Sequence, residues 1–264
     1  MNMLWVAAVM GVVEGLTEFL PVSSTGHLIV AGHVLGFTGE RAATFEIFIQ
    51  LGAILAIVVL EWDRFRGLLR TAPGVGFTGL RGCGLLAVTT LPALVAGLLW
   101  HDVVKARLFG PGPVALALFA GGIAILLVER LVPAPRTGGI DALTWGQAGV
   151  IGLGQCLALW PGVSRSAATI LSGLACGLPR RAAATYSFLA AVPVLSAATL
   201  YDLARSWRVL QAADAAPFAI GFLVSFLAAW AVVRSFVALL GRFSLRPFAW
   251  YRIAIAPAVF WLVR

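Results

Sequence analysis

The stretch Glu14-Gly-Leu-Thr-Glu18-Phe-Leu-Pro-Val-Ser-Ser-Thr-Gly-His27 combines two carboxylates, several hydroxyls and a histidine in a chain that is otherwise strongly apolar. A carboxylate at membrane depth costs about 2.5 kcal/mol or more on insertion scales, so such groups persist only beside a cavity, a partner or an ion. Pro21 also interrupts the apolar run, and a proline breaks the hydrogen-bond pattern of a helix. The stretch therefore predicts a functional site at a broken helix.

The composition around this stretch is that of a membrane protein. The 264 residues are 61% hydrophobic and 11% charged, whereas a soluble domain has about 25% charged residues. Six apolar stretches have about the length that a bilayer requires, at residues 44–60, 83–100, 112–128, 182–200, 215–233 and 247–263. We therefore predict an all-α, polytopic integral membrane protein with six full transmembrane helices.

The sequence partly repeats itself after 140 residues. Pro21 matches Pro161, Ser24 matches Ser164, and Phe48 matches Phe188. In each half, an apolar run broken by proline leads through a serine-rich turn into a second run, at 24–36 and 164–177, that is too short to span a bilayer. Non-helical backbone at this depth is tolerated only where it lines a cavity. The pattern predicts two re-entrant helical hairpins.

One hairpin and three full spans in each half would reverse the direction of the second half, because three is an odd number. We therefore expect a single membrane domain over residues 1–264, made of two inverted repeats at 1–131 and 141–264 with a polar linker at 129–141. The active elements of inverted repeats commonly meet near the midplane of the membrane. The two hairpin tips are thus expected to form one site.

The net charge of +8 arises from 19 basic and 11 acidic residues. The basic residues lie in short loops, which is typical of the positive-inside rule and does not favour nucleic acid as a partner. The predicted cytoplasmic side carries twelve arginines and the outer side six basic residues, so both termini and the mouth of the first hairpin are expected to face outward. The first set is Arg64, Arg66, Arg70, Arg81, Arg130, Arg136, Arg180, Arg181, Arg234, Arg242, Arg246 and Arg252; the second is Arg41, Lys105, Arg107, Arg205, Arg208 and Arg264.

Glu14 and Glu18 are candidate metal ligands. At a spacing of i, i+4 they share one face of a helix, and two carboxylates in a low dielectric repel each other unless a proton or a cation intervenes. Oxygen ligands suit Mg²⁺ or Ca²⁺. The pair therefore predicts a divalent cation site, the alternative being a helix-capping or helix-pairing role for one acid.

The turn that follows predicts an anion site. Ser23, Ser24 and Thr25 supply hydroxyls and backbone N–H groups at a helix N-terminus, which attracts anions; plain N-capping is the alternative. His27 follows Ser24 by about one helical turn, so an imidazole can reach the same pocket. We predict Ser23 and Thr25 as phosphate-binding residues, and as catalytic residues Glu18, Ser24 and His27.

The second tip adds a permanent positive charge. Ser164, Arg165 and Ser166 combine hydroxyls with a guanidinium fork that suits phosphate oxygens. The alternatives are an arginine that reaches the lipid headgroups or one that pairs with Glu18. We predict all three as phosphate-binding residues.

Acids for a metal, hydroxyls with a histidine, and an arginine together indicate hydrolysis of a phosphoryl group. A site inside the membrane implies a lipid phosphate or diphosphate as substrate. An inverted-repeat transporter or flippase of a lipid phosphate is the alternative, and a purely structural scaffold would leave the charged residues unexplained.

These motifs resemble those of the bacterial undecaprenyl-diphosphate phosphatase family of the bacitracin-resistance type. The resemblance covers nearly the whole chain and includes further motifs at 44–52, 155–166 and 188–193. The resemblance implies hydrolysis of undecaprenyl diphosphate to undecaprenyl phosphate and inorganic phosphate, which recycles the lipid carrier for peptidoglycan synthesis. It also implies an inner-membrane location, a site facing the periplasm, dependence on a divalent metal, bacitracin resistance and a homodimer. The family's functional positions fall on Glu14, Glu18, Ser24, His27 and Arg165.

Our mechanistic hypothesis at this point has Ser24 attack the terminal phosphorus while His27 takes its proton. In the competing hypotheses, the nucleophile that attacks the phosphorus is His27 itself or a water molecule. Mg²⁺ or Ca²⁺ would bridge the two acids and the diphosphate. Glu46 and Gln50 share one face of the first span, where they either support the acids or form an interhelical hydrogen bond.

Overall fold

The computed structural model describes residues 2–70, 76–132, 134–136, 138–206, 210–240 and 244–262. All regular secondary structure in these ranges is helical, and five of the described helices are long and apolar enough to cross a membrane. The predicted class, an all-α polytopic membrane protein, is confirmed.

Each predicted span coincides with a helix. Five of the six meet the length needed to cross the bilayer. The sixth has 17 described residues, and residue 263 lies outside the described part, so the count of six spans stays a prediction. The helices are α3 (Glu40–Leu60), α5 (Gly79–Leu108), α6 (Pro111–Leu131), α9 (Arg180–Ser206), α10 (Ala215–Leu240) and α11 (Arg246–Leu262); short helices α4 (Trp62–Leu68), η1 (Ile140–Ala142) and η4 (Ala212–Asp214) lie in the connections.

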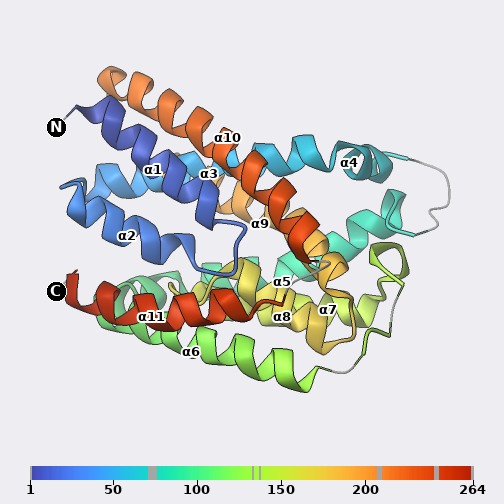
Figure 1. The fold of residues 1–264 in the computed structure, drawn as a ribbon. Coiled ribbons are helices and arrows are strands. Elements are labelled where there is room, and N and C mark those ends of the chain that lie inside the picture. The colour runs from blue at the N-terminus through green and yellow to red at the C-terminus, as the bar shows by residue number, and fades with distance from the viewer. Residues whose placement is uncertain are drawn as a thin grey trace.

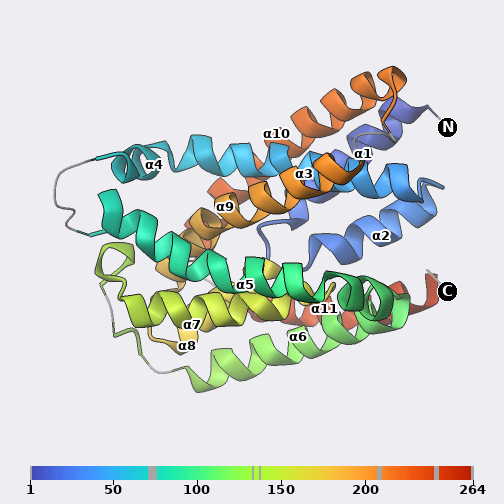
Figure 2. The ribbon, with the colours of Figure 1, turned by 180° about the vertical axis from the view of Figure 1, so that it is seen from behind.

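Two helical hairpins occupy the predicted positions. The first hairpin enters the bundle from the end where both labelled termini lie and the second from the opposite end, so that their tips meet in the middle (Figures 1 and 2). This arrangement agrees with inverted repeats, whose exact division stays a prediction. The hairpins consist of α1 (Met3–Thr17) with α2 (Ser24–Val34), and of α7 (Trp145–Cys156) and η2 (Leu157–Leu159) with α8 (Arg165–Ala175).

The two halves interlock, because the first helix of each hairpin packs on a span from the other half. Helix α1 packs on α10, and α7 packs on α5. A Cβ built on Gly11 would lie 2.6 Å from the carbonyl oxygen of Gly221, and one on Gly152 would lie 2.8 Å from that of Val88. Glycine therefore permits the close helix approach that stabilises helix pairs in membranes.

Replacing Gly11 by alanine is expected to force α1 away from α10 and to lower the thermal unfolding midpoint in detergent by roughly 5 °C. Gly149 on α7 is the matched control, because nothing lies within 4 Å of a Cβ built there. Alanine at Gly149 should leave the midpoint unchanged or raise it slightly, since alanine favours helix over glycine. Equal effects at both positions would contradict the packing argument.

The hairpin tips match with a spacing of 141 residues, one more than the sequence comparison used. Ser23 and Ser164 are the N-caps of α2 and α8, with φ of 71° and 73°. Ser24 therefore corresponds to Arg165, and its predicted pairing with Ser164 was one residue off. The adjacent serines Ser23 and Ser24 had made both registers plausible from the sequence.

One charge assigned to the cytoplasmic loops was misplaced. Arg252 lies in the middle of α11 and is 0% exposed, so its charge says nothing about orientation. Arg208, Arg242 and Arg264 lie outside the described residues, as does the side chain of Lys105. The orientation in the membrane stays a prediction.

Candidate active site

A cavity of about 130 Å³ lies between the two hairpin tips. Six of the predicted site residues line it: Glu18, Ser23, Ser24 and Thr25 from the first hairpin, and Ser164 and Arg165 from the second. The remaining wall is formed by Gln50 of α3, Leu195 of α9, and Ala158, Trp160, Pro161 and Gly162 before α8. The fold thus brings residues about 140 positions apart into one pocket.

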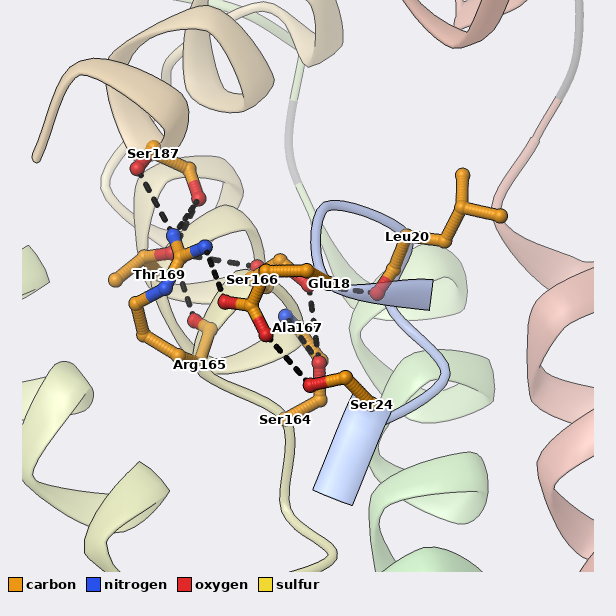
Figure 3. A network of polar contacts seen from close by, with 9 residues as sticks. All are labelled: Glu18, Leu20, Ser24, Ser164, Arg165, Ser166, Ala167, Thr169 and Ser187. Atoms are coloured by element: carbon orange, nitrogen blue, oxygen red, sulfur yellow. Dashed lines mark hydrogen bonds and ion pairs between the residues drawn. The ribbon is translucent and has the colours of Figure 1, made fainter. Parts of the chain in front are cut away.

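Glu18 connects the two tips through its carboxylate (Figure 3). The hydroxyl of Ser24 donates to Oε2 of Glu18 at 2.5 Å, and the Nη2 group of Arg165 donates to Oε1 at 3.0 Å. The side chains of Glu18 and Arg165 are only 6% and 9% exposed. Of the alternatives for Arg165, the pairing with Glu18 is therefore present and the reach to the headgroups is wrong.

Arg165 is also held from behind by α9. Its Nη1 group donates to the carbonyl oxygen of Ser187 at 3.1 Å, and the hydroxyls of Ser187 and Thr169 lie 2.6 Å apart (Figure 3). Its Nε group has no hydrogen-bond partner among the described residues. Ser187 and Thr169 were not among the predicted site residues, and the signal that could have found them is a hydroxyl within an apolar helix. The guanidinium is thus fixed, with one buried donor left for an anion.

The first turns of α2 and α8 differ in their capping. The hydroxyl of Ser164 accepts a hydrogen bond from the backbone N–H of Ala167 at 3.2 Å, whereas the Ser23 side chain caps nothing in the described structure. Ser164 therefore caps its helix as well as lining the cavity, whereas Ser23 does not cap α2. The uncapped N–H groups of α2 are suited to an anion, because they carry the positive end of the helix dipole.

Ser166 lies behind the cavity. It is fully buried, and its hydroxyl donates to the carbonyl oxygen of Leu20 at 2.7 Å and contacts the Ser164 hydroxyl at 3.0 Å. This side chain joins the two tips to each other. It does not line the pocket that was predicted to hold phosphate.

His27 also lies outside the cavity lining. Its Nδ1 atom is 2.7 Å from the carbonyl oxygen of Ser23, and its Nε2 atom is 2.6 Å from the hydroxyl of Tyr251 on α11. The Ser24 hydroxyl, which was predicted to give its proton to His27, donates to Glu18 instead. Tyr251 was not among the predicted site residues.

Glu14 lies one helical turn before Glu18 and is completely buried. Neither of its carboxylate oxygens has a hydrogen-bond partner within the described part of the chain, and a buried carboxylate without a partner is costly. Gln50 lines the cavity, while Glu46 lies 3.6 Å from a Cβ built on Gly32, between α3 and α2. Of the two, Gln50 reaches the cavity, whereas Glu46 lies near Glu14 and interacts with its charge.

Glu14 and Glu18 supply part of the ligand set that a divalent cation requires. Glu14 offers two unpartnered oxygens and Glu18 faces the cavity, and both are the oxygen donors that Mg²⁺ or Ca²⁺ prefers. The described residues contain no group of three or more His, Cys, Asp or Glu side chains placed to hold a metal ion. Substrate oxygens and water would have to complete the coordination.

The model of the family described as bacitracin resistance protein BacA matches residues 7–258. The chain belongs to the BacA family. An undecaprenyl-diphosphatase of Nitratidesulfovibrio vulgaris (strain DP4) is 60% identical over 257 residues, covering 97% of each chain. Another from Maridesulfovibrio salexigens is 58% identical over 263 residues, 99% of this chain and 100% of the relative. The family predicted from the motifs is confirmed.

Arg252 holds the two tips of this BacA-family protein together. Its guanidinium donates to Pro21 of the first tip at 3.1 Å and to Gly162 and Val163 of the second at 2.8 and 2.9 Å, always to carbonyl oxygens. Two further acceptors are carbonyl oxygens of α6, and a Cβ built on Gly121 of that helix would overlap the guanidinium. Of its five hydrogen bonds, three thus satisfy carbonyl oxygens that the broken helices leave unpaired, and two fix the guanidinium against α6.

Proposed function

We propose that this BacA-family protein hydrolyses undecaprenyl diphosphate to undecaprenyl phosphate and inorganic phosphate, and so recycles the lipid carrier for peptidoglycan synthesis. The observation that carries the proposal is the meeting of Ser24, Glu18 and Arg165 in one cavity inside an apolar bundle. The name of the two relatives supports the same substrate. Bacitracin resistance would follow from a greater supply of the recycled carrier.

The diphosphate would bind with its terminal phosphate between the tips. The unpartnered Nε group of Arg165 and the first-turn N–H groups of α2 supply donors, and the hydroxyls of Ser23 and Thr25 line the same wall. A bound phosphate would share Arg165 with Glu18 and would stop the guanidinium from neutralising that carboxylate alone.

The contact between Ser24 and Glu18 supports the following chemical step. The Ser24 oxygen attacks the terminal phosphorus, the bond from that phosphorus to the bridging oxygen breaks, and undecaprenyl phosphate leaves with both electrons of that bond. The Ser24 proton moves to Oε2 of Glu18, which already accepts it at 2.5 Å. Glu18 then passes this proton to the departing undecaprenyl phosphate and is a carboxylate again. In the second step water attacks the phosphoserine, Glu18 takes a proton from that water and returns it to the Ser24 oxygen, and inorganic phosphate is released.

A divalent cation is part of the proposal. Glu18 and Glu14 would hold it together with oxygens of the diphosphate, where it would neutralise the charge of the substrate and of the leaving phosphate. Arg165 would continue to orient the terminal phosphate, and Gln50 would support the cavity wall from α3.

The first test is release of inorganic phosphate from a polyprenyl diphosphate by the purified protein in detergent, with and without EDTA. We expect release that EDTA suppresses by at least about 10-fold and that added Mg²⁺ or Ca²⁺ restores. Release that EDTA leaves unchanged would remove the metal from the mechanism. Absence of release from folded protein would favour the transporter instead, for which the two hairpins entering from opposite ends are the supporting observation.

The Ser24→Ala variant is expected to lose phosphate release by about 10²-fold or more, because it lacks the attacking oxygen. Rapid-quench experiments with substrate labelled in the terminal phosphate should trap a phosphoserine in the unaltered protein and none in Ser24→Ala. Ser225→Ala is the control, since this buried serine on α10 makes no hydrogen bond through its side chain in the described structure. Turnover without label on the protein would assign the attack to water.

We further propose that the protein lies in the bacterial inner membrane with the mouth of the first hairpin facing the periplasm. The arginines of the connecting segments support this orientation, with Arg252 no longer counted among them. A homodimer stays a prediction that the family resemblance suggests.

A further inference from the structure

His27 is fixed at both nitrogens of its ring by groups far apart in the chain. The Ser23 carbonyl oxygen lies 2.7 Å from Nδ1, and the Tyr251 hydroxyl lies 2.6 Å from Nε2. The two rings stack with centroids 5.5 Å apart and planes at 8° to each other. The imidazole therefore has a single orientation, set by α2 on one side and by α11 on the other.

The partners also determine the tautomer. A carbonyl oxygen can only accept, so Nδ1 carries the hydrogen and donates it to Ser23. Nε2 of the neutral ring is then the acceptor, and the Tyr251 hydroxyl is the donor. Both ring nitrogens are occupied, and neither lies against the Ser24 hydroxyl, whose acceptor is Glu18.

The acceptor of His27 is the most constrained residue of the first tip. Ser23 has φ of 71° at the N-cap of α2, a region that costs a residue with a Cβ about 1 kcal/mol or more. Its carbonyl must be held for this conformation to persist. At the second tip the N-cap residue is Ser164, and the carbonyl of the residue before it, Val163, accepts a hydrogen bond from Arg252. Arg252 follows Tyr251 directly on α11. Two consecutive residues of α11 thus support the two tips.

We propose that Tyr251 and His27 form a strut that holds the Ser23 carbonyl and thereby orients the first turn of α2, where Ser24 and the uncapped N–H groups face the cavity. His27 is then a positioning residue, and Tyr251 is a further positioning residue for the same reaction. This proposal rests on the proposed phosphatase function.

The test compares His27→Asn, His27→Ala and Tyr251→Phe by kcat, KM and pH profile of phosphate release. An asparagine side chain places an N–H close to the position of Nδ1 and can still donate to Ser23, but an amide takes up no proton at neutral pH. We expect His27→Asn to keep about a tenth of the wild-type kcat and His27→Ala about a hundredth or less. Tyr251→Phe removes one oxygen atom and should lower kcat by about 5- to 10-fold, with the shape of the pH profile unchanged.

Two control variants make the tyrosine-to-phenylalanine and histidine-to-asparagine changes at positions away from the site. Tyr201→Phe removes a hydroxyl that contacts Arg205 on α9, and His33→Asn alters an exposed histidine of the same helix α2; both should keep wild-type kcat. If His27→Asn is as inactive as His27→Ala and one limb of the pH profile is lost, His27 is the proton acceptor. That result would contradict the proposal that His27 is a positioning residue. Full activity of Tyr251→Phe would also overturn it. Inactivity of the wild-type protein would instead reject the phosphatase function.

Discussion

Replacing Arg165 by alanine is expected to lower kcat/KM for phosphate release by about 10²- to 10³-fold. The variant loses the only described cation in the cavity lining and leaves Glu18 buried without its ionic partner. A carboxylate in that position would repel the diphosphate instead of sharing a guanidinium with it. The measurement is steady-state phosphate release in detergent micelles at several substrate concentrations.

Arg64→Ala is the matched control, because Arg64 also forms an ion pair, with Glu61 at 3.2 Å, but at the end of the bundle. It should change kcat/KM by less than about 2-fold, since this pair is partly exposed, lies away from the cavity lining, and ion pairs near the surface contribute little. Arg165→Lys keeps the charge but loses the two-pronged hold on Glu18 and Ser187, and should fall between alanine and wild type. Near-normal turnover of Arg165→Ala would remove this residue from phosphate binding.

Replacing Arg252 by glutamine is expected to destabilise the fold as well as abolish activity. A glutamine amide can donate to at most two of the five carbonyl oxygens that Arg252 contacts. Three of these carbonyls belong to the tips, and each one left without a donor costs about 1–3 kcal/mol, so the thermal midpoint in detergent should fall by roughly 10 °C or more. Thermal unfolding of the purified variant, followed by intrinsic tryptophan fluorescence, is the measurement.

Arg246→Gln makes the same change at an exposed position of the same helix. It should leave both the midpoint and the phosphatase rate close to wild type. An Arg252→Gln protein as stable as Arg246→Gln would show that water or another side chain satisfies the tip carbonyls, and would contradict the role assigned to this guanidinium.

The sequence predicted the helices well because their signals are local. The length of an apolar stretch is set by the thickness of the bilayer, so it indicates a membrane-spanning helix. A proline followed by serines indicates where a helix breaks. The short runs predicted at 24–36 and 164–177 correspond to α2 and α8 within a few residues. Six of the predicted site residues line the cavity, and they could be recognised because ionisable residues at membrane depth are rare without a role.

The contacts that organise the site were not visible, because they join distant parts of the chain or cross a break. Ser24 and Glu18 are six residues apart with a turn between them, a spacing that no helical periodicity relates. Tyr251 is 224 residues from His27. Arg252 belongs to an apolar helix, and the loop-charge argument counted it with the cytoplasmic arginines because the sequence does not show what surrounds it.

The position of Arg252 in the chain also affects the order in which the molecule is built. Val163 precedes it by 89 residues and Pro21 by 231. At 5–20 residues per second, a ribosome would make Arg252 about 4 to 18 s after Val163 and about 12 to 46 s after Pro21. During that interval the carbonyls of both tips must be satisfied by water or by the insertion machinery. The nascent chain therefore gains its phosphatase site only when α11 enters the membrane, after all the residues that do the chemistry are already there.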